Sequence, residues 1–133
     1  MLRIDPILQK MKTQKETQFA VIFASDQSPR KSQLAHFTSF LNQETAVAYG
    51  AERMAREFDI PIFAGSNIKV SRGHYKVILT LISDDHSKFK KGEITAAFTE
   101  QLEKDILSAP QFWLWSHKRW KHLKSEHRTN RLI

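Results

Sequence analysis

Two kinds of hydrophobic pattern run along the chain, one typical of buried strands and one typical of helices that face a core. Residues 19–24 form a continuous apolar run of six, which predicts a central, parallel strand covered on both faces. Residues 60–64 begin a second buried strand. Between them, apolar residues recur at helical spacing from Val47 to Phe58, with Thr45 available as an N-cap. A helix between two such strands predicts a βαβ crossover.

The second half of the chain shows a hairpin pattern followed by a helical one. Two β-rich runs, 67–70 and 75–82, flank a turn at Arg72-Gly73 and predict an antiparallel hairpin at a sheet edge. A helix is expected from Glu93, where apolar residues recur every four positions, and Pro110 ends it or begins another.

These patterns together predict an α/β fold. We expect a partly parallel sheet flanked by helices, with an antiparallel edge hairpin and a C-terminal helix pair, in a single domain over residues 1–133. Residues 6–16 predict a short amphipathic helix that starts at a proline, and residues 29–44 are interpreted as a loop.

Composition narrows the class of protein. A chain of 133 residues with 41% hydrophobic and 26% charged residues is typical of one globular domain. It has no cysteine, which excludes disulfides and cysteine-based metal sites, and its six histidines show no metal-binding spacing. No apolar run is long enough to span a bilayer and the N-terminus lacks a signal-peptide pattern, so we do not expect an integral membrane protein.

Positive charge is concentrated near the C-terminus. The formal net charge is +7, and from His117 to Arg131 six Lys or Arg stand against one acid, Glu126, so that +5 falls in this stretch. Such an excess favours an anionic partner, although a basic tail over about residues 122–133 can also simply keep a protein soluble.

The same region holds all three tryptophans, within Pro110–His122. Aromatic rings with a polar tip settle where an apolar phase meets water, and neighbouring cations add attraction to anionic headgroups. We therefore predict an interface with an anionic membrane surface. The alternative is that Trp113, Leu114 and Trp120 belong to the core of a last helix. The predicted interface residues are Trp113, Trp115, Lys118, Trp120 and Lys121.

The spacing of this segment carries a specific resemblance. Pro-x-x-Trp-Leu-Trp-x-His-Lys-Arg-Trp-Lys, residues 110–121, resembles the closing signature of the late acyltransferases of lipid A biosynthesis, a branch of the lysophospholipid acyltransferase superfamily. Ser25–Pro29 is similar to the Asp-Gln element of that family, and residues 37–47 and 50–58 resemble its next two segments. The resemblance covers about residues 19–121.

The resemblance implies an activity and its partners. Such enzymes transfer a fatty acyl chain from acyl carrier protein or acyl-CoA to a lipid A precursor at the cytoplasmic face of the bacterial inner membrane, without a cofactor. The candidate substrate-binding residues are Asp26, Gln27, Arg72 and Arg119. Each has a plainer alternative: Asp26 can cap the turn before Pro29, Arg72 can be a turn residue, and Arg119 can pair with a core carboxylate instead of a phosphate.

One element of the superfamily is missing. Its enzymes use a His-x4-Asp/Glu pair, whose carboxylate orients the imidazole that takes the acceptor's proton. None of the residues five positions after the six histidines is acidic; they are Leu41, Leu79, Lys91, His122, His127 and Leu132. The chain thus resembles the C-terminal half of such an enzyme, and we predict that it is inactive by itself.

Two other functions remain open. A non-enzymatic basic module that binds nucleic acid or an acidic protein would explain the charge and the interleaved aromatic residues, but no RRM, KH or zinc-finger pattern supports it. A short protein that keeps the acyltransferase fold as a scaffold is the other alternative.

Overall fold

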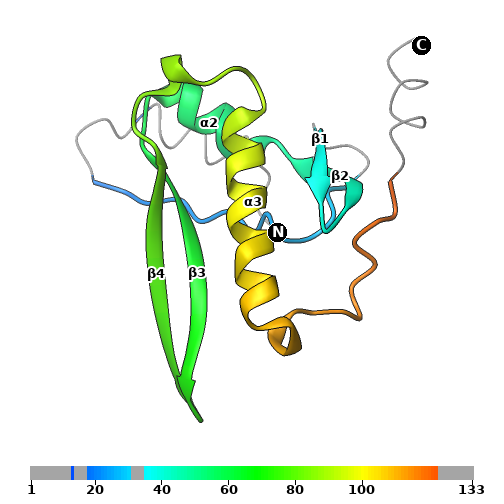
Figure 1. Cartoon of the computed structure of the whole chain (residues 1–133). Coiled ribbons are helices and arrows are strands. Elements are labelled where there is room, and N and C mark those ends of the chain that lie inside the picture. The colour runs from blue at the N-terminus through cyan, green and yellow to red at the C-terminus, as the bar shows by residue number, and fades with distance from the viewer. Residues whose placement is uncertain (1–12, 14–17, 31–34, 123–133) are drawn as a thin grey trace.

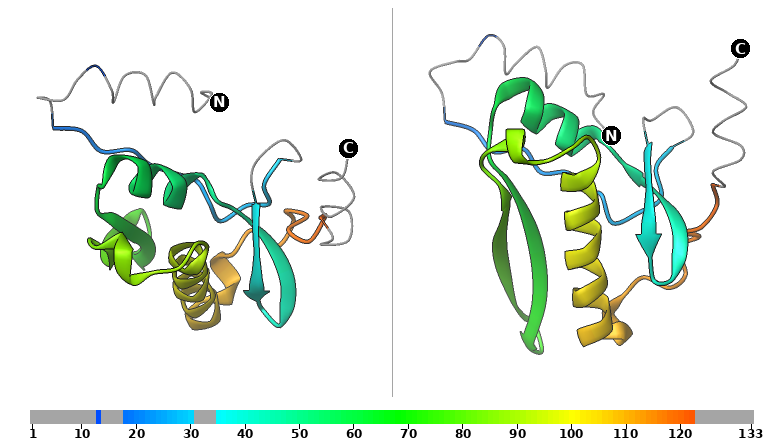
Figure 2. Two further views of the ribbon diagram at one scale, coloured as in Figure 1. Left: turned by 90° about the horizontal axis from the view of Figure 1, so that it is seen from above. Right: turned by 45° about the horizontal axis from the view of Figure 1, so that its top comes forward.

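The computed structural model describes residue 13, residues 18–30 and residues 35–122. A long helix, α3, lies between two separate antiparallel hairpins, and a shorter helix, α2, lies near its N-terminal end (Figure 1). Residues 18–30 run without regular secondary structure from the α2 side of the molecule to the β1–β2 hairpin (Figure 2). The bounds are β1 Ala35–Phe40, β2 Gln43–Ala48, α2 Gly50–Phe58, β3 Ile62–Ser71, β4 His74–Ser83, η1 His86–Lys88, α3 Glu93–Ser108 and η2 Pro110–Phe112.

The loop predicted over residues 29–44 is wrong from residue 35 onward, where the β1–β2 hairpin stands in its place. Its strands pair from Ala35 with Ala48 to Phe40 with Gln43. Leu41 and Asn42 between them both have positive φ, 49° and 60°. Such a two-residue turn matches the twist of antiparallel strands, and Asn tolerates the left-handed conformation that it needs.

Helix α2 confirms the predicted helix apart from its first three residues. Thr45 is not its N-cap, because Thr45 belongs to β2, and Tyr49 at the N-cap makes no side-chain cap bond. Met54 and Ala55 are buried on the inner face. The helix ends at Asp59, whose φ of 50° is left-handed and turns the chain toward β3.

The β3–β4 hairpin confirms the predicted pairing and turn, although it forms a sheet of two strands by itself. Gly73 at its tip has a φ of 77°, which a glycine adopts without steric cost. Ala64 and Ser66 are buried on the face toward α3, where the Ser66 hydroxyl donates to Asp105. The opposite face is exposed.

Helix α3 confirms the predicted helix from Glu93, with Ile94 and Ile106 buried and the Glu100–Lys104 ion pair formed at 2.9 Å. The predicted C-terminal helix pair is wrong. After Ala109 the chain makes one short 3₁₀ turn and then continues without a helix to His122. Pro110 accounts for the break, because it has no N–H for the helix and disfavours the helical conformation in the residue before it.

The partly parallel sheet is also wrong. Residues 19–24 are extended but belong to no strand, and Ile22 is 95% exposed. β2 and β3 flank α2 but lie in different sheets, so no βαβ crossover forms. The apolar run indicates a segment suited to a strand, yet a strand exists only where another backbone lies beside it to hydrogen-bond.

The core sits between α3, α2 and the β1–β2 hairpin, around the fully buried Phe40, Met54 and Ile94. The helix predicted over residues 6–16 and the basic tail predicted over residues 122–133 lie outside the described residues, apart from Thr13 and His122. Within the described ranges, no helix is both long enough and apolar enough to cross a bilayer.

Candidate functional site

The fold brings together two of the segments that were singled out in the sequence. The backbone N–H of Ser28 donates to His117 Nε2 at 3.1 Å, and His122 Nε2 donates to the Pro29 carbonyl at 2.7 Å. The Ser25–Pro29 element and the Trp-rich segment, residues 110–122, thus lie side by side although about 90 residues separate them in the chain. Without a helix to hold it, the Trp-rich segment depends on such contacts for its position.

Phe40, at the end of β1, is the centre around which this segment packs. The Trp113 ring meets it edge-on with the centroids 6.2 Å apart, and the Trp120 ring lies at 6.3 Å. The Trp120 indole N–H also donates to the Thr45 hydroxyl at 2.9 Å. Two of the three tryptophans therefore pack half-buried against Phe40, whereas Leu114, the third residue of the core alternative, is 55% exposed, and no helix carries them.

Arg119 is a buried cation with only 3% of its surface exposed. Its Nη1 donates to the Ala46 carbonyl at 2.8 Å, and its guanidinium lies 5.5 Å above the Phe40 ring. Burial lowers the pKa of Arg119, and the negative charge of Asp26 opposes that shift. Within the described residues, Nε finds no hydrogen-bond partner. At 3% exposure the guanidinium is not accessible to a phosphate in solution, and its hydrogen bond goes to a backbone carbonyl.

The other candidate substrate residues do not join Asp26 and Arg119 in one site. Gln27 is exposed beside Asp26. Arg72 is exposed at the tip of the β3–β4 hairpin, across α3 from the β1–β2 hairpin that holds Arg119 (Figure 1). A single ligand would have to reach around α3 to touch both arginines.

The predicted interface set also divides into half-buried members, Trp113 and Trp120, and exposed members. Trp115 is 56% exposed, with its indole N–H held by the Pro110 carbonyl at 2.7 Å. Lys118 and Lys121 are exposed. These three side chains are available to a partner surface.

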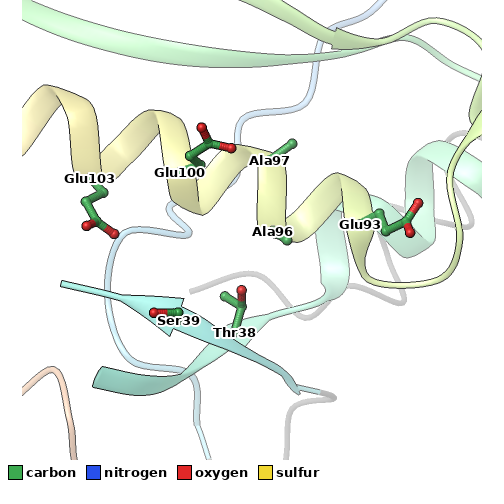
Figure 3. Close-up of a pocket in the computed structure, with 7 residues that line it drawn as sticks. All are labelled: Thr38, Ser39, Glu93, Ala96, Ala97, Glu100 and Glu103. Carbon is green, nitrogen blue, oxygen red and sulfur yellow. The ribbon is translucent and has the colours of Figure 1, made fainter. Parts of the chain in front are cut away.

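A shallow groove of about 450 Å³ lies between β1 and α3 (Figure 3). Its three glutamates all have partners: Glu93 accepts from the Lys90 N–H, Glu100 pairs with Lys104, and Glu103 accepts from the Leu41 N–H. Negative charge repels a phosphorylated ligand. The groove lining is Thr38, Ser39, Glu93, Ala96, Ala97, Glu100 and Glu103.

The model of one protein family, described as bacterial lipid A biosynthesis acyltransferase, matches residues 3–122. The chain belongs to this family. The match spans the Ser25–Pro29 element, both hairpins and the Trp-rich segment, and it confirms the resemblance drawn from the motifs. Neither the curated proteins nor the solved structures contain a match to the chain.

An acyltransferase of this family needs a base for the acceptor hydroxyl, so the surroundings of the histidines matter. His117 Nε2 accepts from the Ser28 N–H, and that bond occupies its lone pair. His86 is buried, with Nδ1 at the Ser83 hydroxyl and Nε2 at the Ile60 carbonyl, both 2.9 Å away. His74 and His122 contact hydroxyl or carbonyl oxygens. In the part of the chain that the structure describes, no histidine is hydrogen-bonded to a carboxylate.

The sequence interpretation missed a buried carboxylate, Glu52, because charged residues of an amphipathic helix usually lie on its outer face. Glu52 instead points inward and accepts from the Gly92 N–H at 2.8 Å, the Thr95 N–H at 2.8 Å and the Thr95 hydroxyl at 2.6 Å. Arg56 Nε donates to it at 3.0 Å. Burial alone would raise the pKa of Glu52, but these hydrogen bonds outweigh it and leave the pKa below its ordinary value.

The Glu52–Arg56 pair joins α2 to the start of α3 in this acyltransferase chain. Glu52 satisfies N–H groups at the first turn of α3, where a carboxylate is favourable. Arg56 donates further to the carbonyls of His86, Phe89 and Lys90. The i, i+4 spacing of the two residues was the available signal, but that spacing is equally common on exposed helix faces.

Proposed function

We propose that this chain is the lipid-facing part of a membrane-associated bacterial acyltransferase. The reaction moves a fatty acyl chain from acyl carrier protein or acyl-CoA to a hydroxyl of a lipid A precursor, at the cytoplasmic face of the inner membrane. The family match over residues 3–122 carries the proposal. The net charge of +7 supports it, because acyl carrier proteins, lipid A precursors and inner-membrane lipids are all anionic.

We place the chemical step outside these residues. In acyl transfer, the acceptor oxygen attacks the thioester carbon, a base takes the hydroxyl proton, and the thiol leaves. The sequence has no histidine followed five positions later by an acid. Asp26 has Arg119 as its charged neighbour, so a role in stabilising the core accounts for it without catalysis.

The isolated chain is expected to show no acyl transfer. Purified protein, supplied with an acyl carrier protein thioester and a lipid A precursor, should yield no acylated lipid by mass spectrometry, because its sequence lacks the His-x4-Asp/Glu pair. An active family member assayed in parallel is the positive control. Product formation that a single His→Ala substitution abolishes would contradict the proposal.

The exposed part of the Trp-rich segment is expected to bind anionic bilayers. Each cation near an acidic lipid surface contributes about 1 kcal/mol, so Lys118→Ala/Lys121→Ala should weaken binding about thirtyfold at low ionic strength. Added salt should weaken the wild type as well. Vesicle sedimentation measures both effects.

A matched control removes two exposed lysines elsewhere. Lys88→Ala/Lys90→Ala changes the net charge equally, near the start of α3. Equal loss in both variants would mean that charge alone governs binding. Tighter binding to single-stranded DNA than to vesicles would instead favour the nucleic-acid module.

A further inference from the structure

The β3–β4 hairpin has an outer face that is apolar and uncovered. The strand register places Phe63 opposite Leu81, Asn67 opposite Val77 and Lys69 opposite Tyr75. Because side chains alternate along a strand, these residues and Leu79 share one face. Ala64 and Ser66 are buried on the other face, toward α3, whereas Ile68 and Ile78 on that face are 45% and 38% exposed. The large members of the outer face, Phe63, Tyr75, Val77, Leu79 and Leu81, are between 47% and 68% exposed.

The hairpin carries positive charge and no negative charge. Residues 60–83 contain no Asp or Glu. It has three exposed cations: Lys69 on the outer face, Arg72 at the tip, and Lys76, which the register places opposite Ile68 on the face toward α3. A soluble hairpin more often alternates both signs of charge on its surface.

The hairpin is continuous with a second apolar area at the end of α3. Lys69 Nζ lies 5.3 Å from the centre of the Phe112 ring, which joins the hairpin to η2. The hairpin tip and the C-terminal end of α3 point to the same end of the molecule (Figures 1 and 2). Four large apolar residues are more than half exposed in and after this end of α3: Leu107, Phe112, Leu114 and Trp115.

We propose that this hairpin surface, formed by the outer face and tip of β3–β4 together with Leu107–Trp115, binds an anionic phospholipid bilayer. The exposed apolar side chains would enter the interfacial layer, and Lys69 and Arg72 would contact the lipid phosphates. The inference deepens the proposed function, because it extends the lipid-contacting area from the Trp-rich segment to the β3–β4 hairpin. An acidic protein partner would also attract the cations, but it would not explain why five apolar residues are exposed on one face of the hairpin.

The test uses the full chain and vesicles of phosphatidylcholine with or without phosphatidylglycerol. Lys69→Gln/Arg72→Gln should weaken binding to the anionic vesicles about thirtyfold at low ionic strength. Val77→Ser/Leu79→Ser should weaken it about tenfold, because it removes apolar area from the contact. Circular dichroism and the thermal midpoint check that each variant folds. If the serine variant is unfolded, the Lys69/Arg72 variant decides.

Lys88→Ala/Lys90→Ala is the matched control, because these exposed lysines lie near the opposite end of α3. Unchanged vesicle affinity in both hairpin variants would overturn the inference. It would also be overturned if sedimentation velocity showed a dimer that Val77→Ser/Leu79→Ser dissociates while vesicle binding stays the same. If binding falls only in Lys118→Ala/Lys121→Ala, this inference fails while the proposed function stands. The vesicles hold no acyl donor, so the result is independent of catalysis.

Discussion

Glu52→Ala is expected to lower the free energy of unfolding by about 4 kcal/mol, because it breaks a buried ion pair on one side only. The substitution would leave Arg56 with one partner fewer and would orphan the N–H groups of Gly92 and Thr95 at the start of α3. Chemical denaturation monitored by circular dichroism would measure the loss. The effect is large because leaving a buried N–H without an acceptor costs more free energy than a satisfied hydrogen bond contributes to stability.

Glu100→Ala is the matched control, because Glu100 makes a similar i, i+4 pair with Lys104 in solvent. We expect no measurable loss of stability there, because solvent screens an exposed ion pair. The Glu52 effect should also depend on pH. The pKa of Glu52 is lowered in the folded state, so its stabilisation is present above the unfolded-state pKa and is lost as the pH falls through the folded-state pKa. A Glu52→Ala penalty that stays constant into strong acid would contradict this account.

Phe40→Ala is expected to destabilise the domain by a similar amount, about 4 kcal/mol, since it empties a fully buried site. Trp113 and Trp120 both pack on the Phe40 ring, and Arg119 lies above it. The variant should therefore also shift tryptophan fluorescence to longer wavelength under conditions where it remains folded. Denaturation and emission spectra measure the two effects separately.

Phe63→Ala provides the comparison, because Phe63 is half exposed on β3. It should cost less than about 1 kcal/mol and leave the emission spectrum unchanged. A Phe40 variant of normal stability and normal emission would show that the tryptophans do not depend on this ring. In that case all three tryptophans would be available to a membrane, as the clustering of tryptophans and cations in the sequence indicated.

The sequence pattern correctly predicted the helices and the turn that depend on neighbouring residues in the chain. The helical spacing before Phe58 and after Glu93 reappears as α2 and α3, because one face of each helix meets the core. The Arg72-Gly73 turn reappears as the tip of the β3–β4 hairpin, because Gly73 tolerates positive φ. The family resemblance also rested on short motifs, and the match over residues 3–122 confirms it.

Strand pairing and the burial of charged side chains depended on tertiary contacts. Residues 19–24 are apolar enough for a central strand, but no backbone among the described residues pairs with them. Glu52 and Arg56 have the spacing of a solvated helix pair, and only the approach of Gly92 and Thr95 turns them into a buried cluster.

The sequence by itself determined the family, the helices, the β3–β4 turn and the gathering of tryptophans and cations near the C-terminus. Each of these depends on residues close together in the chain, where spacing and side-chain chemistry are sufficient evidence. Only the tertiary structure decided that Trp113, Trp120 and Arg119 surround Phe40 while Trp115, Lys118 and Lys121 remain exposed. Which side of a segment is buried depends on what packs against it, and its partner here, the β1–β2 hairpin, lies about 75 residues away.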